Sequence, residues 1–199
     1  MNKVTNELLE KIKQCSQCSS IIGHKKFPIK SHGNYASKYL LVSEAPGKES
    51  LDRNLFWVGV GGQILRTCAA DAGTSLEELF YMTDIVKCWP NINNSNRPPT
   101  EAEIKACSNY LVQEIEELRP KLILAFGKHS ASFLLKRNVK MKHEHGTVHE
   151  LNDDTKVLVM LHPTGIDRQM NRIQYFRQLT LVFEKLRQSK HNEIANIFL

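Results

Sequence analysis

The sequence lacks the long apolar run that a membrane-spanning chain requires. A span needs about 20 apolar residues, and the longest apolar stretches here, such as 122–126 and 157–161, are short. The N-terminal stretch MNKVTNELLEKIKQC has mixed charge in a helical pattern and no apolar core of the kind found in signal peptides. We therefore expect a cytoplasmic protein with no membrane partner.

Cysteine is also scarce, and its count is odd. An odd number of cysteines in a chain expected in the cytoplasm argues against a disulfide framework. Metal-binding, redox and core roles stay open for the five cysteines, which are Cys15, Cys18, Cys68, Cys88 and Cys107.

Acidic residues are fewer than basic ones, by 27 − 21 = 6. The excess permits a polyanionic partner such as a nucleic acid, and a solvated basic surface accounts for it equally well. Apolar residues make up 41% and charged residues 24% of the chain, which is ordinary for a globular protein. The length predicts a single domain over residues 1–199, or at most two small ones.

Four apolar stretches predict β-strands. They are mostly apolar and do not alternate, as expected of parallel strands buried on both faces, and they cover residues 39–43, 79–86, 121–126 and 156–161. Helical patterns lie between and after them, at residues 62–72, 100–118, 128–137 and 173–187. In the second of these, Thr100 and Glu103 are spaced as a capping box. The alternation predicts an α/β fold, a three-layer α/β/α sandwich with a central four-stranded parallel sheet.

Three of the four predicted strands end in unusual sequences. These are SEAPG (43–47), TDIVKC (83–88) and LHPTG (161–165), whereas the third strand ends in the plainer GKHS (127–130). Ligands of open α/β sheets bind outside the carboxyl ends of the strands. We therefore expect the functional residues in these loops.

Four of the cysteines form a candidate metal site. Cys15 and Cys18 form a C-x-x-C pair, and Cys88 and Cys107 flank a polar loop rich in Asn and Pro. Four thiolates can bind one tetrahedral zinc ion or one iron–sulfur cubane, and the wide spacing of the second pair favours iron–sulfur. As an alternative, Cys88 and Cys107 are small buried apolar residues, the role we expect for Cys68 in a predicted helix.

These motifs together resemble the family 4 branch of the uracil-DNA glycosylase superfamily. SEAPGKES, FWVGVGGQIL, TDIVKCWP, NRPPTEAEIKAC and HPTG occur in the family's order, from Cys15 to about Arg177. The resemblance implies a monofunctional DNA glycosylase that flips a base out of DNA, hydrolyses its N-glycosidic bond and leaves an abasic site. It also implies a [4Fe–4S] cluster on Cys15, Cys18, Cys88 and Cys107, with residues 1–38 supplying the first two. No obligate protein partner is evident.

The resemblance places five residues around a flipped base. Trp57 stands at the family's aromatic position, where stacking on a base is worth roughly 1–3 kcal/mol, although a core role beside Phe56 is possible. Backbone N–H groups near Ala45 and Gly47 can point at the leaving base. Glu44 matches a pocket glutamate that can orient water or stabilise a cationic sugar, and it is otherwise an exposed loop acid. His162 matches the catalytic histidine, whose hydrogen bond to the departing oxygen strengthens in the transition state.

Asp84 departs from the family, which normally has Asn at this position, and Ser43 replaces the first Gly of the first motif. An ionised Asp offers only hydrogen-bond acceptors, so it mismatches the O4 of uracil and suits the N4 amine of cytosine. Two other interpretations of Asp84 are open. Burial keeps the carboxyl group protonated, or the residue acts as the catalytic acid or base.

We interpret Asp84 as a sign of a changed base, a modified cytosine. Removal of plain cytosine would destroy the host genome, whereas hydroxymethylated or glucosylated cytosine of phage DNA would suit anti-phage defence. Excision of uracil in base excision repair is the alternative. An alternative of another class is a non-catalytic iron–sulfur module for DNA binding or redox sensing.

Two further groups of residues are candidates for binding. Four basic residues in the loops at the active edge are candidates for phosphate contacts, which position DNA without reading its sequence; they are Lys48, Arg53, Arg97 and Arg168. His143, His145 and His149 suggest zinc, with His143 and His145 alternating on one face of a strand. A solvated strand is the interpretation we favour for these three histidines, because no fourth ligand is near in the sequence.

Overall fold

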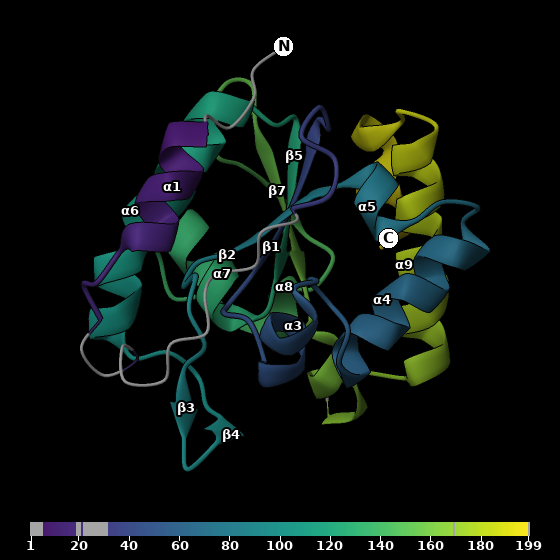
Figure 1. The fold of residues 1–199 in the computed structure, drawn as a ribbon. Helices are drawn as coiled ribbons and strands as arrows, with labels where there is room; N and C mark the ends of the chain where they lie inside the picture. Colours follow the sequence, from purple (N-terminus) through teal and green to yellow (C-terminus); the bar gives the residue numbers. More distant parts are fainter. Residues whose placement is uncertain (1–5, 19–20, 22–31, 169, 199) are drawn as a thin grey trace.

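A five-stranded sheet forms the centre of the protein in a computed structural model, which describes residues 6–18, 21, 32–168 and 170–198. The strand order is β2-β1-β5-β7-β6 (Figure 1). The strands are β1 (Tyr39–Ser43), β2 (Tyr81–Asp84), β5 (Leu122–Phe126), β6 (Val148–Glu150) and β7 (Lys156–Met160). Four strands run parallel to one another, namely β1, β2, β5 and β7. The fifth, β6, pairs antiparallel with β7 at the edge of the sheet.

The predicted α/β sandwich is confirmed, and two details of the prediction are wrong. The sheet has a fifth strand, β6, which is three residues long and therefore too short to show a periodic pattern. The stretch 79–86 is a strand only over Tyr81–Asp84. It starts late because a capping box on Ser75 begins the short helix α5 (Leu76–Leu79) just before it.

Helices cover both faces of the sheet (Figure 1). On one face lie α1 (Asn6–Gln14), α6 (Glu101–Leu118) and α7 (Lys128–Leu134), and on the other lie α4 (Val60–Asp71), α5 and α9 (Arg172–Arg187). The remaining helices are α3 (Lys48–Arg53), α8 (Met141–Glu144) and two 3-10 helices, η1 (Pro163–Arg168) and η2 (His191–Ile197). In the described part of the chain, none of the helices is both long and apolar enough to traverse a bilayer.

Alternate residues of each strand supply two separate cores, which explains why the strands are apolar without interruption. One core, packed against α4 and α9, contains Leu41, Met82, Leu124, Phe126, Leu158 and Met160. The other, packed against α1, α6 and α7, contains Leu40, Val42, Tyr81, Ile123, Ala125, Val157 and Val159.

The capping box predicted for α6 is present. The Thr100 side chain accepts from the Glu103 backbone N–H, and the Glu103 carboxylate accepts from the Thr100 N–H at 2.8 Å. This cap starts the helix at Glu101 and so places Cys107 in its second turn, facing the protein interior.

The predicted strand through His143 and His145 is wrong. His143 lies in α8, and His145 directly follows that helix. The His145 ring is buried, stacks on Tyr175 and accepts the Leu161 backbone N–H at 3.2 Å. Burial lowers the His145 pKa to about 4, as expected of a neutral core histidine.

Candidate active site

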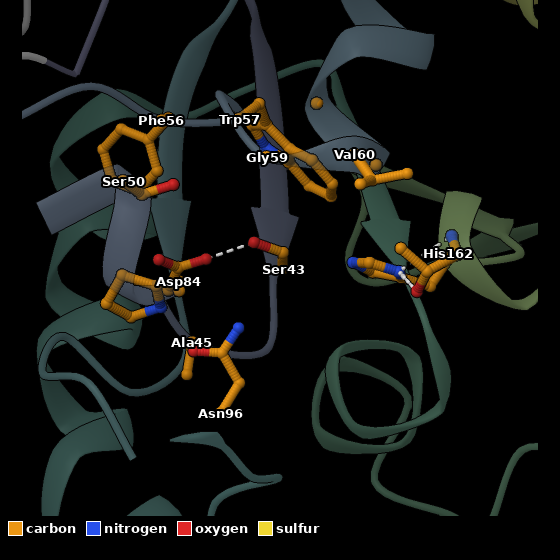
Figure 2. A pocket seen from close by; sticks show the side chains of 15 residues that line it. Ser43, Ala45, Ser50, Phe56, Trp57, Gly59, Val60, Asp84, Asn96 and His162 are labelled. Carbon is orange, nitrogen blue, oxygen red and sulfur yellow. Dashed lines mark hydrogen bonds between the residues drawn. The ribbon is translucent and has the colours of Figure 1, made fainter. Parts of the chain in front are cut away.

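One cavity opens at the carboxyl edge of the sheet and brings together residues from distant parts of the chain. Ser43 ends β1, Asp84 ends β2, His162 follows β7, and Trp57 precedes α4; all four line the cavity. Figure 2 shows these four side chains around one hollow. This is the position in the fold at which open α/β sheets bind ligands.

The backbone at Trp57 is held in an unusual conformation. Its φ of 57° lies in the left-handed region, which is costly for an aromatic residue. The Arg66 guanidinium donates to the Trp57 carbonyl at 2.9 Å and to the Phe56 carbonyl at 2.8 Å, and it is itself held by Glu77 at 2.6 Å. Gly62 packs so closely that a Cβ there would lie 1.9 Å from the Trp57 carbonyl oxygen. Sequence reasoning missed Arg66 and Gly62, because their partners become visible only in the fold.

The Trp57 ring forms a wall of the cavity. Its indole lies against the His162 imidazole, with centroids 5.4 Å apart and planes inclined by 29°, and its edge meets Phe126. The side chain is 8% exposed, and its Nε1 has no hydrogen-bond partner among the described residues. The ring is therefore positioned by packing alone, with its place set by the turn before α4.

His162 is arranged as a neutral hydrogen-bond donor. The Thr164 backbone N–H points at His162 Nδ1 at 3.4 Å, and the Thr164 hydroxyl lies 2.8 Å from the same nitrogen. These contacts make Nδ1 the acceptor, so we assign the ring proton to Nε2. Removal from water lowers the His162 pKa to about 4, and the imidazole is therefore neutral near pH 7.

Asp84 is the buried carboxyl group of the cavity. The Ser43 hydroxyl donates to Asp84 Oδ1, and the two residues are direct partners in the β1–β2 register. Burial raises the Asp84 pKa to about 7, although the Ser43 hydrogen bond and the Lys87 charge act in the opposite direction. The Asp84 carboxyl group offers a ligand acceptors when ionised and also a donor when protonated.

A buried polar network supports the backbone at Asp84. Lys87 Nζ donates to the Asp84 carbonyl at 2.7 Å, to Thr83 Oγ1 at 2.6 Å and to Glu114 Oε2 at 2.6 Å. Glu114, on α6, also accepts from the Tyr81 hydroxyl at 3.0 Å. Both charges of the Lys87–Glu114 pair are almost wholly buried. The sequence analysis did not predict this pair, because in the sequence Glu114 is one of several charged residues of a helix.

Of the three other residues predicted to line the pocket, two line the cavity and one does not. Ala45 and Gly47 line the cavity, whereas Glu44 does not. Glu44 Oε2 lies 4.0 Å from His129 Nε2, at the start of α7, and burial raises the Glu44 pKa while His129 lowers it. Asn96, which the sequence analysis did not select, lines the cavity. Its Oδ1 accepts from Trp89 Nε1 at 2.7 Å and from the Lys48 N–H at 3.2 Å, which leaves its NH₂ group for a ligand.

The four candidate cluster cysteines influence one another electrostatically. Burial, followed by the nearby Cys107, Cys18 and Cys15, raises the pKa of Cys88 to about 12. Burial likewise raises the pKa of Cys107 to about 11, with Cys18 and Cys15 again contributing. The Lys87 backbone N–H donates to Cys107 Sγ at 3.2 Å. Mutual effects of this kind require the four thiols to be near one another at one side of the fold.

The described residues contain no group of three or more His, Cys, Asp or Glu side chains close enough to hold a single metal ion. The same result leaves the three-histidine zinc site without support. A cubane is larger than one ion and spreads its four sulfur ligands farther apart. A set of four thiolates is suited chemically to either group.

The basic residues predicted to contact DNA differ in their surroundings. Lys48 and Arg53 are exposed at the two ends of α3, beside the cavity. The Arg97 guanidinium is paired with both Glu103 oxygens, at 2.8 and 2.5 Å, and also donates to the Asn91 and Pro98 carbonyls. The Arg168 side chain lies outside the described part of the chain. Phosphate contacts by these residues stay a prediction.

A family profile and several individual proteins that resemble this chain all belong to the uracil-DNA glycosylases. The family profile described as "Uracil DNA glycosylase superfamily" matches residues 30–187. The type-4 uracil-DNA glycosylase of Saccharolobus solfataricus is 36% identical over 137 residues, which cover 68% of this chain and 61% of that protein. The type-4 enzyme of Archaeoglobus fulgidus is 27% identical over 168 residues, covering 81% of this chain and 82% of the relative. The Thermotoga maritima type-4 enzyme is 28% identical over 173 residues, covering 86% of each.

Replacement of Gly62 by Ala is expected to displace the Trp57 turn. The added methyl group would overlap the Trp57 carbonyl, and overpacking of this kind costs about 1–3 kcal/mol. We expect a lower Tm and a changed near-UV circular dichroism signal. The matched control is Gly165→Ala, where an added Cβ meets nothing within 4 Å. Equal behaviour of the two variants would contradict the close packing of Gly62 on Trp57.

Replacement of Asp84 by Asn is expected to stabilise the protein more at pH 8 than at pH 5. The pKa of Asp84 is about 7 when folded and about 3.9 when unfolded. The folded state therefore binds the proton more tightly, and this residue's contribution to stability falls as the pH rises from about 4 to about 7. Because Asn cannot ionise, the difference in unfolding free energy between the variant and wild type should grow by about 2–3 kcal/mol from pH 5 to pH 8.

Urea unfolding at the two pH values measures this difference. The matched control is Asp153→Asn in an exposed loop. This variant should differ from wild type in unfolding free energy by the same amount at pH 5 and at pH 8. If Asp84→Asn also behaves identically at pH 5 and pH 8, the carboxyl group does not titrate as its burial requires.

Proposed function

This chain belongs to the uracil DNA glycosylase superfamily, and we propose that, as a DNA glycosylase of this superfamily, it flips a pyrimidine nucleotide into the cavity and hydrolyses its N-glycosidic bond. Base flipping is required because the glycosidic bond cannot be reached inside a duplex. The cavity offers what a flipped base needs: an aromatic wall at Trp57, a polar edge at Asp84 and a hydrogen-bond donor at His162.

His162 stabilises the departing base in this proposal. Base loss places negative charge on a carbonyl oxygen of the base and positive charge on the sugar. A neutral imidazole with its proton on Nε2 can donate to that oxygen, and the bond strengthens as the charge develops. Its low pKa, about 4, keeps His162 in this form over the physiological range.

Asp84 and Ser43 carry our proposal for the substrate, a base of the cytosine type. The Ser43 hydroxyl donates to Asp84 Oδ1, and both residues line the cavity. When ionised, the Asp84 carboxylate accepts well from the N4 amine of cytosine and repels the O4 of uracil. We therefore favour a cytosine that carries a modification foreign to the host, such as a hydroxymethyl or glucosyl group in phage DNA. A role in defence against phages would follow.

Uracil is the second candidate, and two observations favour it. The relatives are named uracil-DNA glycosylases. In addition, the Asp84 pKa of about 7 leaves a substantial protonated fraction near neutral pH. A protonated Oδ2 would donate to the O4 of uracil, as the amide of an Asn can. An enzyme of this kind would serve base excision repair.

An iron–sulfur cluster on Cys15, Cys18, Cys88 and Cys107 is the cofactor we propose. The mutual effect of the thiols on their pKa values supports it, as does the similarity to type-4 enzymes. When bound, such a cluster would join the N-terminal segment to the segment that runs from β2 into α6.

Replacement of Asp84 by Asn tests the substrate. An Asn restores a donor beside an acceptor, so excision of uracil should rise by about tenfold or more while excision of modified cytosine falls. Alkali cleavage of oligonucleotides that contain uracil, cytosine, hydroxymethylcytosine or glucosylated hydroxymethylcytosine measures both activities.

His162→Ala is the control for the chemistry and should lower excision of every substrate, whereas Ser43→Gly should change the preference between bases. If the wild type excises uracil readily and leaves every cytosine-type base intact, the assignment of a cytosine substrate is wrong.

Replacement of Cys88 by Ala tests the cluster. The purified variant should lose most of its bound iron and sulfide and its visible absorbance, because one of four ligands is missing. Cys68→Ala is the matched control: Cys68 is buried in the core against α9, and its thiol donates to the Phe176 carbonyl at 3.7 Å. Retention of iron by Cys88→Ala, or equal loss from both variants, would contradict the assignment.

A further inference from the structure

The cavity contains one hydroxyl group to which the proposed chemistry gives no role. Three hydroxyl side chains line the cavity, those of Ser43, Ser50 and Thr164. Ser43 donates to Asp84, and the Thr164 hydroxyl lies against the His162 ring. The Ser50 hydroxyl, in contrast, has no hydrogen-bond partner among the described residues.

Ser50 is held in the wall of the cavity by α3, of which it is the third residue. Its carbonyl accepts from the Leu55 backbone N–H at 3.0 Å, at the end of that helix. Ser50 as a whole is only 9% exposed. A hydroxyl group that is largely withdrawn from water without a partner costs free energy. We therefore expect a ligand in the cavity to supply the partner.

Ser50 lies on the side of the cavity that also carries Asp84. Figure 2 shows Ser50, Phe56 and Asp84 on one side of the hollow. His162 is on the opposite side (Figure 2). Next to the acid, this side therefore combines a small hydroxyl side chain with the buried ring of Phe56. Such a surface suits a short substituent made of carbon and one oxygen.

The shape of a pyrimidine relates these two sides to each other. O2 and a substituent on C5 point in opposite directions across the ring. The groups on C4 and C5 are neighbours, on the edge that faces the major groove in a duplex. A base that directs O2 to His162 and its C4 group to Asp84 therefore directs C5 to the side that carries Ser50.

We propose that Ser50 determines specificity at C5 of the base, and that its hydroxyl binds the oxygen of a 5-hydroxymethyl group. The inference rests on the proposed function and deepens it, since Asp84 distinguishes bases at C4 and Ser50 distinguishes them at C5. A serine hydroxyl both donates and accepts. It can therefore pair with a free hydroxymethyl group, and it can donate to the linking oxygen when that group carries a sugar.

Replacement of Ser50 by Ala tests the contact on two pairs of substrates. One pair of oligonucleotides contains cytosine or 5-hydroxymethylcytosine, the other contains uracil or 5-hydroxymethyluracil, and alkali cleavage measures excision. The ratio of hydroxymethylated to plain base excised should fall by about three- to tenfold in Ser50→Ala, because one hydrogen bond is lost. Asp84→Asn should instead change the preference between the two pairs.

Replacement of Ser50 by Val also fills the space beside C5. The same ratio should fall by about tenfold to a hundredfold, because the substituent would overlap the added methyl groups. The matched control is Ser132→Ala on α7, which removes a helical hydroxyl that accepts the Val139 N–H at 3.0 Å outside the cavity lining. This control should keep the wild-type ratio. An unchanged ratio in both Ser50 variants would overturn the proposal.

A binding measurement tests the contact without requiring excision. Duplexes with a 2′-fluoroarabino nucleotide, which resists hydrolysis, carry the same bases, and fluorescence anisotropy gives Kd. Wild type should bind the hydroxymethylated member of a pair more tightly than the plain member, and Ser50→Ala should lose most of this difference. Equal Kd values within each pair for wild type would overturn the Ser50 site, whether or not bases are excised. Absence of excision with the difference intact would overturn the proposed function and leave the site standing.

Discussion

The parallel pairing of β1 with β2 places Ser43 opposite Asp84, and the chemistry of the cavity depends on that register. Opposed residues in a parallel pair direct their side chains to the same face, so the hydroxyl and the carboxyl group meet inside the protein. The contact engages Oδ1 of the carboxyl group and orients the group within the cavity. Burial then brings the Asp84 pKa to about 7, where its hydrogen-bonding character depends on its protonation.

Two ion pairs brace the segment that runs from Asp84 to Cys107. Lys87 is paired with Glu114 behind the cavity, and Arg97 is paired with Glu103 in the first turn of α6. Both carboxylates belong to α6, so one helix holds both parts of the segment. A buried ion pair adds little net stability because its desolvation is costly. We interpret these two as devices that set the position of Asp84, Asn96 and the cysteines.

The wall of the cavity at Trp57 contains a strained backbone. Trp57 adopts a left-handed conformation that costs of order 1–3 kcal/mol, and the Arg66 clamp on its carbonyl offsets part of that cost. Gly62 removes the side chain that would prevent α4 from starting so close to the turn. The result is an indole presented to the cavity by main-chain geometry, with His162 against its face.

The sequence by itself determined the layers of the fold, the four main strands, the start of α6 and the residues at the strand ends. These features depend on local patterns: uninterrupted apolar stretches, a capping box, and motifs placed directly after strands. Asp84 and His162 could be placed together because parallel strands bring their carboxyl ends to one edge, whereas Trp57 was selected through the resemblance to a known family.

Only the tertiary structure decided which of these groups touch. The Ser43–Asp84 bond joins residues 41 apart in the sequence, and Glu44 faces His129 instead of the cavity. Arg66, Gly62, Asn96 and the Lys87–Glu114 pair were not recognisable, because a contact between distant residues leaves no periodic trace in a single sequence. The protonation of Asp84 could not be predicted from the sequence either. Its pKa depends on burial, and only the packed molecule determines which groups are buried.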